Sequence, residues 1–260
     1  KVNALDKTNS LFNTDLMKRE RQLMLNNKRI KSCEKACWIP EDKGKWSLRL
    51  ETQSNKKHYT NIIAKPEELD IQLSSDCNLT CSYCCKEFSS AWRRDIIHNG
   101  DYNYHKDNRY NLRNIDKVLE RLSQKSRQNS AFYSQIKKEL VETINDLKLL
   151  VISGGEPFLH NDLILFVNVF QNVPTIKIMT GLGVNKERFR RILDDILKIK
   201  KVILVISAES LTENYEFNRF GNTYDHFLEM VDIVKSYNIN YGFSTTYSNL
   251  TVFDYVKFYE

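Results

Sequence analysis

The sequence predicts an α/β protein, built as a partial (β/α)6 TIM-like barrel of parallel strands with a small N-terminal α+β module. Two observations support this fold class. From about residue 69, short apolar segments alternate with longer segments whose apolar residues recur at helical spacing, whereas residues 1–68 lack this alternation. Repeated strand–helix–strand units with buried strands imply right-handed crossovers and a parallel sheet. A complete doubly wound sheet is the alternative arrangement of the same elements.

Five short apolar segments are the strand candidates: Leu69–Leu73, Leu149–Ile152, Thr175–Met179, Lys201–Ile206 and Asn240–Thr245. The helix candidates are Ile115–Leu122, Phe132–Leu147, Asn161–Phe170, Lys186–Ile199 and Asp225–Tyr237. The best defined apolar face is that of the fourth helix, with Phe189, Ile192, Leu193 and Ile196. A further apolar stripe at residues 252–259 indicates a helix that has only begun. We therefore expect residues 69–260 to form a barrel that lacks its last strand, in a chain that is a fragment.

The first 68 residues are expected to form a separate module. They contain a helix candidate at Asp15–Asn26, a turn with two cysteines, and a hairpin candidate made of Lys45–Thr52 and Lys57–Ile63. Residues 86–113 are polar and rich in His, Asn and Tyr, which predicts a long loop.

The composition is that of an ordinary soluble globular protein, with 41% hydrophobic and 28% charged residues among 260. No apolar run approaches the ~20 residues that a bilayer span requires, and the first residues lack the apolar core of a signal peptide. We therefore expect a cytoplasmic protein without a membrane partner, in which six cysteines serve metal or redox chemistry. The basic clusters behind the net charge of +6 are short and scattered, which argues against a nucleic-acid partner.

Three cysteines, Cys77, Cys81 and Cys84, follow the first strand candidate with the spacing C-x3-C-x2-C. They are therefore expected at the carboxyl edge of the parallel sheet, where barrel enzymes place their chemistry. Three thiolates on one iron–sulfur cubane leave the fourth iron open, whereas electron-carrier ferredoxins close all four positions with cysteine. An open iron suits a chelating ligand such as the amine and carboxylate of an amino acid. A zinc site and a chance cluster are the alternatives.

Tyr83 precedes the last of these cysteines, and the resulting C-x3-C-x-aromatic-C pattern resembles the signature of the radical S-adenosylmethionine (SAM) superfamily. The resemblance implies an enzyme with a [4Fe–4S] cluster on Cys77, Cys81 and Cys84 and with SAM as second cofactor, near Tyr83. It implies reductive cleavage of SAM to methionine and a 5′-deoxyadenosyl radical that abstracts hydrogen from a substrate. An electron donor such as flavodoxin or ferredoxin is the implied partner.

The second strand ends in Gly154, Gly155, Glu156 and Pro157. Two glycines before a carboxylate let the backbone pass close to a ligand and place an acceptor at the strand end, although an ordinary turn has the same pattern. Behind a C-x3-C-x2-C loop, the stretch resembles the GGE motif of the superfamily. The motif implies contact between these residues and the methionine amine of SAM.

Further along, Ser207 and Glu209 end the fourth strand and resemble the family's S-x-D stretch, with Glu where Asp is commoner. The resemblance implies that Ser207 contacts the ribose or carboxylate of SAM. Arg219, in the stretch Asn218–Gly221, resembles the family's Arg-Gly element and is expected to bind the SAM carboxylate through a bidentate pair. The third strand ends Thr180-Gly181, where relatives often read T-N-G.

Two N-terminal cysteines extend the resemblance. The stretch from Arg21 to Arg49, with Cys33 and Cys37, and the segment Lys86–Trp92 resemble radical SAM proteins that carry a twitch or SPASM auxiliary-cluster module. Cys33 and Cys37 would then bind a second iron–sulfur cluster, although their spacing is x3 and not x2. Two ordinary reduced cysteines are the alternative. Cys85 is expected to be a small packing residue.

The substrate is not defined by these motifs. A ribosomally made peptide is one hypothesis, because auxiliary-cluster relatives often modify peptides, and a small metabolite or sugar-nucleotide is the other. A binding or electron-carrying iron–sulfur protein without turnover is a third class, which the Gly154–Pro157 motif argues against.

Overall fold

The computed structural model describes residues 12–54, 62–63, 65–102, 108–112, 115–117, 119 and 146–259. The chain divides into two compact units, Lys1–Pro66 and Glu67–Glu260, and each is described by itself. Half of the helix candidate at 115–122 lies outside the described residues, as do most of the helix candidate at 132–147 and most of the second hairpin strand at 57–63.

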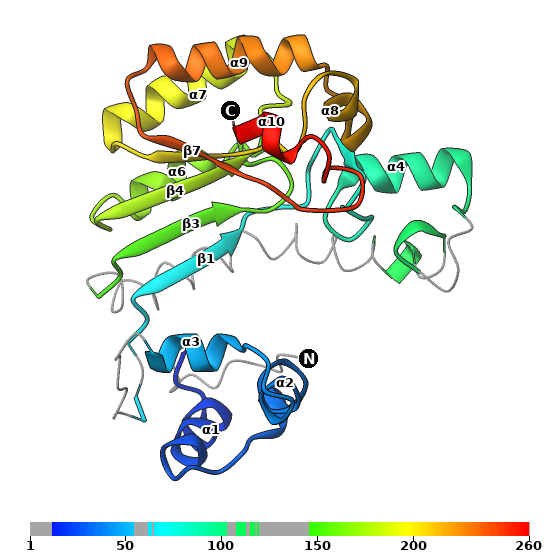
Figure 1. Cartoon of the computed structure of the whole chain (residues 1–260). Helices are drawn as coiled ribbons and strands as arrows, with labels where there is room; N and C mark the ends of the chain where they lie inside the picture. Colours follow the sequence, from blue (N-terminus) through cyan, green and yellow to red (C-terminus); the bar gives the residue numbers. More distant parts are fainter. Residues whose placement is uncertain are drawn as a thin grey trace. The chain divides into compact units, whose positions relative to one another are not determined.

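The larger unit is built on a parallel sheet, as predicted. Its five strands lie in sequence order: β1 (Glu68–Gln72), β3 (Leu149–Ser153), β4 (Thr175–Thr180), β5 (Ile203–Ser207) and β7 (Tyr241–Ser244). Each agrees with its predicted segment to within two residues. Among the described strands, β1 and β7 each pair on one side, so the barrel is not closed (Figure 1).

Alternating side chains of the central strands form the core. Leu150 and Ile152 of β3, Ile176 and Ile178 of β4, and their counterparts on β5 are fully buried. Helices α6 (Leu163–Val169), α7 (Lys186–Ile199) and α9 (Tyr224–Ser236) connect the strands, and α7 and α9 run along the same side of the sheet (Figure 1). Helix α7 has the predicted bounds. Asn185 caps its N-terminus, and its four predicted apolar residues are all buried.

Shorter elements lie beyond the carboxyl ends of the strands (Figure 1). They are β2 (Thr80–Cys81), α4 (Ser90–Asn99), η3 (Asn108–Tyr110), η4 (Pro157–Leu159), α8 (Thr212–Asn218), β6 (Arg219–Phe220) and α10 (Tyr255–Tyr259). The predicted loop at 86–113 is wrong for the part that forms α4. That helix begins because the Ser89 side chain accepts a hydrogen bond from the Trp92 backbone, and it buries Ala91, Arg93 and Ile96.

The N-terminal unit is helical in the part that the structure describes: α1 (Asp15–Leu25), η1 (Lys31–Cys33), a π-helical turn η2 (Glu34–Trp38), α2 (Ile39–Asp42) and α3 (Leu48–Ser54). Helix α1 confirms the first helix candidate. The strand expected at Lys45–Thr52 is wrong, because α3 begins there, with Ser47 accepting a hydrogen bond from the Leu50 backbone. In neither unit does a described helix have the length and hydrophobicity of a membrane span.

Candidate active site

The loop between β1 and α4 carries the three predicted metal-binding cysteines. Cys81 is buried and Cys77 and Cys84 are half-buried, all as free thiols. Burial raises the pKa of Cys77 to about 11 and that of Cys84 to about 12, and it also raises the pKa of Cys81. Cys81 adds to the increase at Cys77, and both add to the increase at Cys84. The three thiols are therefore close enough for their charges to interact.

The donor set consists of three cysteine thiols, the ligands that iron–sulfur clusters use. Within the described parts of the chain, no three His, Cys, Asp or Glu side chains gather closely enough to hold one metal ion. A [4Fe–4S] cubane takes each thiolate on a different iron, so its ligands stand further apart than those of one ion. The raised pKa values mean that these thiolates are costly without a cation beside them. One buried and two half-buried thiols in a single loop thus fit the cluster.

The cysteine loop is tied to a distant segment by the two-stranded antiparallel pair of β2 and β6. In this pair Thr80 lies opposite Phe220, and Cys81 lies opposite Arg219. The Ser82 backbone and hydroxyl both donate to Asn218, each at 2.9 Å. The segment between β5 and α9 therefore packs along the cysteine loop, and this places Arg219 beside Cys81.

Arg219, Glu209 and Tyr83 form a buried network. The guanidinium donates to both carboxylate oxygens of Glu209, from Nε at 2.8 Å and from Nη2 at 2.7 Å. The Tyr83 hydroxyl donates to Glu209 at 2.9 Å and accepts from Arg219 at 2.5 Å. Burial alone would lower the pKa of Arg219, but Tyr83, Cys81 and Glu209 together raise it. Two of the three guanidinium nitrogens are thus engaged inside the protein.

The turn after β3 packs directly on the cysteine loop. Gly154 and Gly155 have φ values of +89° and +52°. A Cβ atom at Gly155 would lie 2.2 Å from the Asp76 carbonyl oxygen, so no larger residue fits there. The Glu156 backbone donates to the same carbonyl at 2.7 Å. The glycine pair thus lets the Glu156 turn touch the loop that carries the cysteines.

The Glu156 carboxylate is buried and largely satisfied by the chain. It accepts hydrogen bonds from the Thr180 hydroxyl at 2.9 Å, the Gly181 backbone at 2.9 Å and the Phe158 backbone at 3.2 Å. Burial raises the pKa of Glu156. A carboxylate has about four lone-pair positions, and three protons reach it here, so it can accept one further donor.

Gly181 separates Glu156 from Arg219. A Cβ atom built on Gly181 would lie 3.7 Å from Glu156 Oε2 and 3.0 Å from Arg219 Nη1, the guanidinium nitrogen not bonded to Glu209 or Tyr83. Gly181 thus lies between a carboxylate and a guanidinium, close to both. A group that carries both an ammonium and a carboxylate, such as the methionine end of SAM, fits this charge pattern.

Sequence reasoning missed the role of the first turn of α4. Its side chains donate to backbone carbonyls of the cysteine loop: Ser89 to Leu79 at 2.8 Å, Ser90 to Cys77 at 2.9 Å and Trp92 to Cys81 at 3.0 Å. The resemblance of residues 86–92 to the superfamily marked this segment without giving its role.

Two other predicted residues lie at the edges of this region. Ser207 is half-buried at the carboxyl end of β5, in register with Ser244. Cys85 is buried, and burial raises the pKa of its thiol.

Cys33 and Cys37 lie in the N-terminal unit, in adjoining helical turns. Cys37 is buried and Cys33 is half-buried. Burial raises the pKa of Cys33, and the charge of Cys37 and a side-chain hydrogen bond that Cys37 accepts add to the increase. The two thiols are therefore close enough for the charge of one to affect the other.

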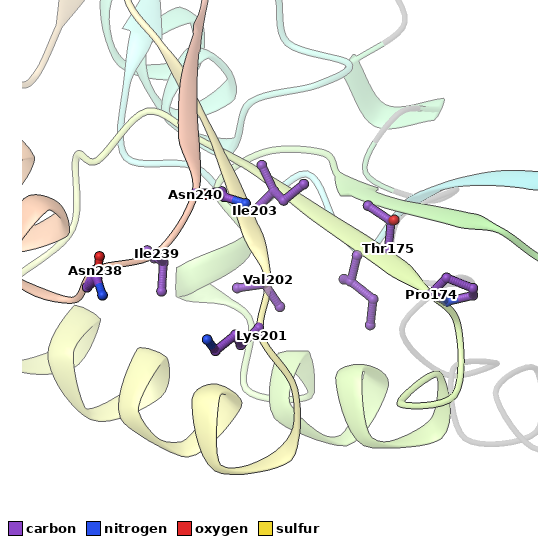
Figure 2. Close-up of a pocket in the computed structure, with 9 residues that line it drawn as sticks. Pro174, Thr175, Lys201, Val202, Ile203, Asn238, Ile239 and Asn240 are labelled. Atoms are coloured by element: carbon purple, nitrogen blue, oxygen red, sulfur yellow. The ribbon is translucent and has the colours of Figure 1, made fainter.

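A hollow of about 290 Å³ lies at the other edge of the sheet. Figure 2 shows its lining residues where the chain enters β4, β5 and β7: Pro174, Thr175, Ile176, Lys201, Val202, Ile203, Asn238, Ile239 and Asn240. These residues precede or begin the strands, whereas the cysteine loop follows β1, so the hollow is not part of the candidate site.

The model of the family described as "Radical SAM superfamily" matches residues 71–258. No curated protein matches the sequence. Streptococcus suis SuiB is 18% identical with a TM-score of 0.48, over 81% of this chain and 40% of SuiB. Its complex with the precursor peptide SuiA gives a TM-score of 0.45 at 18% identity, over the same shares of the two chains. The enzyme anSMEcpe with bound AdoMet is 19% identical with a TM-score of 0.46, over 75% of this chain and 48% of anSMEcpe. This chain thus spans less than half the length of either protein.

Proposed function

Because this chain belongs to the radical SAM superfamily, we propose that its reaction is the reductive cleavage of SAM at a [4Fe–4S] cluster held by Cys77, Cys81 and Cys84. A bound cluster of this kind supplies the electron that breaks the sulfur–C5′ bond of SAM. The 5′-deoxyadenosyl radical that this cleavage would release removes a hydrogen atom from the substrate.

The observation that carries the proposal is the convergence of three separate segments on the cysteine loop. The Glu156 turn bonds to Asp76, Arg219 lies opposite Cys81, and the Asn78 amide donates to the carbonyl of Gly183. A structural metal site needs thiolates alone. Here a carboxylate and a guanidinium, both buried, lie beside the thiols, as the binding of a zwitterion to an open iron requires.

The chain's own residues would act as follows. Glu156 accepts a hydrogen bond from the SAM amine at its remaining lone pair, while Thr180 and Gly181 hold its orientation. Arg219 presents Nη1 alone to the SAM carboxylate, in place of the bidentate pair expected from the sequence, because Glu209 and Tyr83 engage Nε and Nη2. Gly154 and Gly155 keep the Glu156 turn against the loop. Ser207 lies at the edge of the site, where it would contact the ribose or carboxylate.

The substrate we propose is a peptide. Support comes from the resemblance of residues 21–49 and 86–92 to auxiliary-cluster members of the superfamily, which often modify peptides. A gene for a short precursor peptide next to the gene of this chain would favour this class. The direct test is a mass change in that peptide after incubation with reduced enzyme and SAM. SAM cleavage without any peptide change would favour a small metabolite or sugar-nucleotide.

We also propose that Cys33 and Cys37 supply two ligands of an auxiliary iron–sulfur cluster. Their places in adjoining helical turns support this, because thiolates that share one cluster must lie close together in the fold. Two thiolates do not hold a cubane on their own, so the remaining ligands would come from outside the described residues.

Anaerobic reconstitution tests the core proposal. The reduced protein should bind about four irons in the core site, in addition to any auxiliary iron, and should convert SAM to methionine and 5′-deoxyadenosine. Cys84→Ala should abolish core iron and cleavage, while the adjacent Cys85→Ala is the matched control and should keep both. If Cys85→Ala loses the cluster and Cys84→Ala keeps it, the ligand assignment is wrong. Wild-type protein that takes up no iron would overturn the proposed function.

A further inference from the structure

One side chain of the cysteine loop, Leu79, is enclosed by glycines from two other loops. Leu79 lies between Cys77 and Cys81 in sequence and is 3% exposed. Its backbone is also fixed, because its N–H donates to Cys77 Sγ at 3.5 Å and its carbonyl accepts from Ser89. Movement of this residue therefore moves the cysteines on either side of it.

Three glycines leave the space that Leu79 occupies. A Cβ on Gly183 would meet three atoms of the Leu79 side chain at 3.0, 3.1 and 3.2 Å. A Cβ on Gly181 would lie 3.4 Å from Leu79, and one on Gly221 would lie 3.5 Å from it. Gly181 and Gly183 follow β4, and Gly221 follows β6, so Leu79 is inserted where these two loops meet.

The loop after β4 is the same loop that holds Glu156. Gly181 donates its N–H to Glu156, and Thr180 donates its hydroxyl. Leu182, between the two glycines, is fully buried with a φ of +56°, a conformation that costs a non-glycine residue energy and needs support from its surroundings. The Leu79 side chain packs against Gly181 and Gly183, the two glycines that flank Leu182.

We propose that Leu79 is a positioning residue that sets the placement of the cluster thiols relative to the SAM-binding groups. This inference rests on the proposed function, since it assigns a role within the same site. The Leu79 side chain touches the Gly181–Gly183 loop, and its backbone touches Cys77. Through this one side chain, the loop that would hold iron and the loop that supports Glu156 keep a fixed spacing.

The ordinary alternative is a core leucine that contributes stability alone. Leu193 of α7 is fully buried among the helices and the sheet, so Leu193→Ala is the matched control for Leu79→Ala. Both truncations remove the same atoms from a buried site. The two variants are compared in samples matched for bound iron, by SAM affinity from calorimetry and by the electron paramagnetic resonance of the reduced cluster with and without SAM.

A second pair of variants tests the contact from the other side. Gly183→Ala adds a methyl group whose three nearest atoms belong to Leu79, and the backbone of Gly183 is not in the left-handed region. Gly242 of β7 has no atom within 4 Å of such a methyl, so Gly242→Ala is the control. In the double variant Leu79→Ala/Gly183→Ala, the new methyl enters the space that Leu79 has left.

We expect Leu79→Ala and Gly183→Ala each to weaken SAM binding by about tenfold or more, because hydrogen bonds between charged groups weaken steeply when the groups are displaced. The double variant should recover to within about threefold of the wild type, since residues in contact are not additive. Leu193→Ala and Gly242→Ala should bind SAM as the wild type does. A double variant no better than the weaker single variant, or a Leu79→Ala affinity equal to that of Leu193→Ala, overturns the inference. Failure of the proposed function is distinct, because the wild type itself would then bind neither iron nor SAM.

Discussion

The buried ion pair of Glu209 and Arg219 gives the sharpest test of how this site is held together. Their side chains are 1% and 3% exposed, and the guanidinium makes two hydrogen bonds to the carboxylate. Glu209→Gln keeps the shape and one acceptor oxygen but removes the negative charge. Arg219 then remains as a buried cation without its counter-ion. Removing one partner of a buried pair costs about 3–5 kcal/mol of folding free energy.

The partner substitution separates charge from packing. In the double variant Glu209→Gln/Arg219→Met, no charge remains to be solvated, and the Gln oxygen can still accept from the Tyr83 hydroxyl. Replacement of both members of a buried pair is often close to neutral. We therefore expect the double variant to regain at least about 2 kcal/mol of what the single variant loses.

The assay is urea unfolding of the iron-free protein followed by circular dichroism, so that loss of a cluster does not contribute. The exposed pair of Lys198 and Asp195, whose side chains are 74% and 41% exposed, is the control. Asp195→Asn should leave the unfolding midpoint unchanged within error. The reasoning is refuted if Glu209→Gln costs less than about 1 kcal/mol, or if the two substitutions are additive.

Two further predictions concern the cofactors. Glu156→Gln must turn an amide NH2 toward a backbone or hydroxyl donor, so it should weaken SAM binding by about 1.5–3 kcal/mol in calorimetry and also destabilise the fold; unchanged SAM affinity would exclude the amine contact. Replacement of Cys33 and Cys37 by Ser should lower total iron while core iron and SAM cleavage persist, and an unchanged iron count would remove the auxiliary cluster from consideration.

The strands and α7 were predictable because their signals are local. Apolar residues alternate or run continuously in every strand, and the face made by Phe189, Ile192 and Leu193 repeats at helical spacing. Helix α4 was missed because its buried face includes the charged Arg93, which donates to the Lys86 carbonyl and the Ser75 hydroxyl. Because a charged residue lies on the buried face, the buried apolar residues of this helix do not recur at helical spacing.

Helix α3 was mistaken for a strand for a related reason. Leu48 and Leu50 alternate with charged residues, as in a half-buried strand, yet they are 65% and 40% exposed. The alternation of Leu48 and Leu50 with charged residues therefore does not mark a buried face. The helix depends instead on the Ser47 cap and the Arg49–Glu41 ion pair, which bring together residues that the pattern does not connect.

The candidate site was predictable as a set of residues but not as a set of contacts. The motifs placed Cys77, Glu156 and Arg219 at one edge of the sheet. The pairing of Arg219 with Glu209, and the fit of Leu79 against Gly183, join residues without any repeating pattern in the sequence. Complementarity of this kind arises only when the loops meet in three dimensions.

The short antiparallel pair of β2 and β6 has a kinetic consequence. Its backbone register and the bonds from Ser82 to Asn218 link the cysteine loop to the segment that begins α9. Local opening of a protein releases such hydrogen-bonded pieces together, as one cooperative unit. The amide protons of Ser82 and of the paired residues of β2 and β6 should therefore exchange with solvent at a common rate. A disturbance at either segment reaches the other without passing through the sheet.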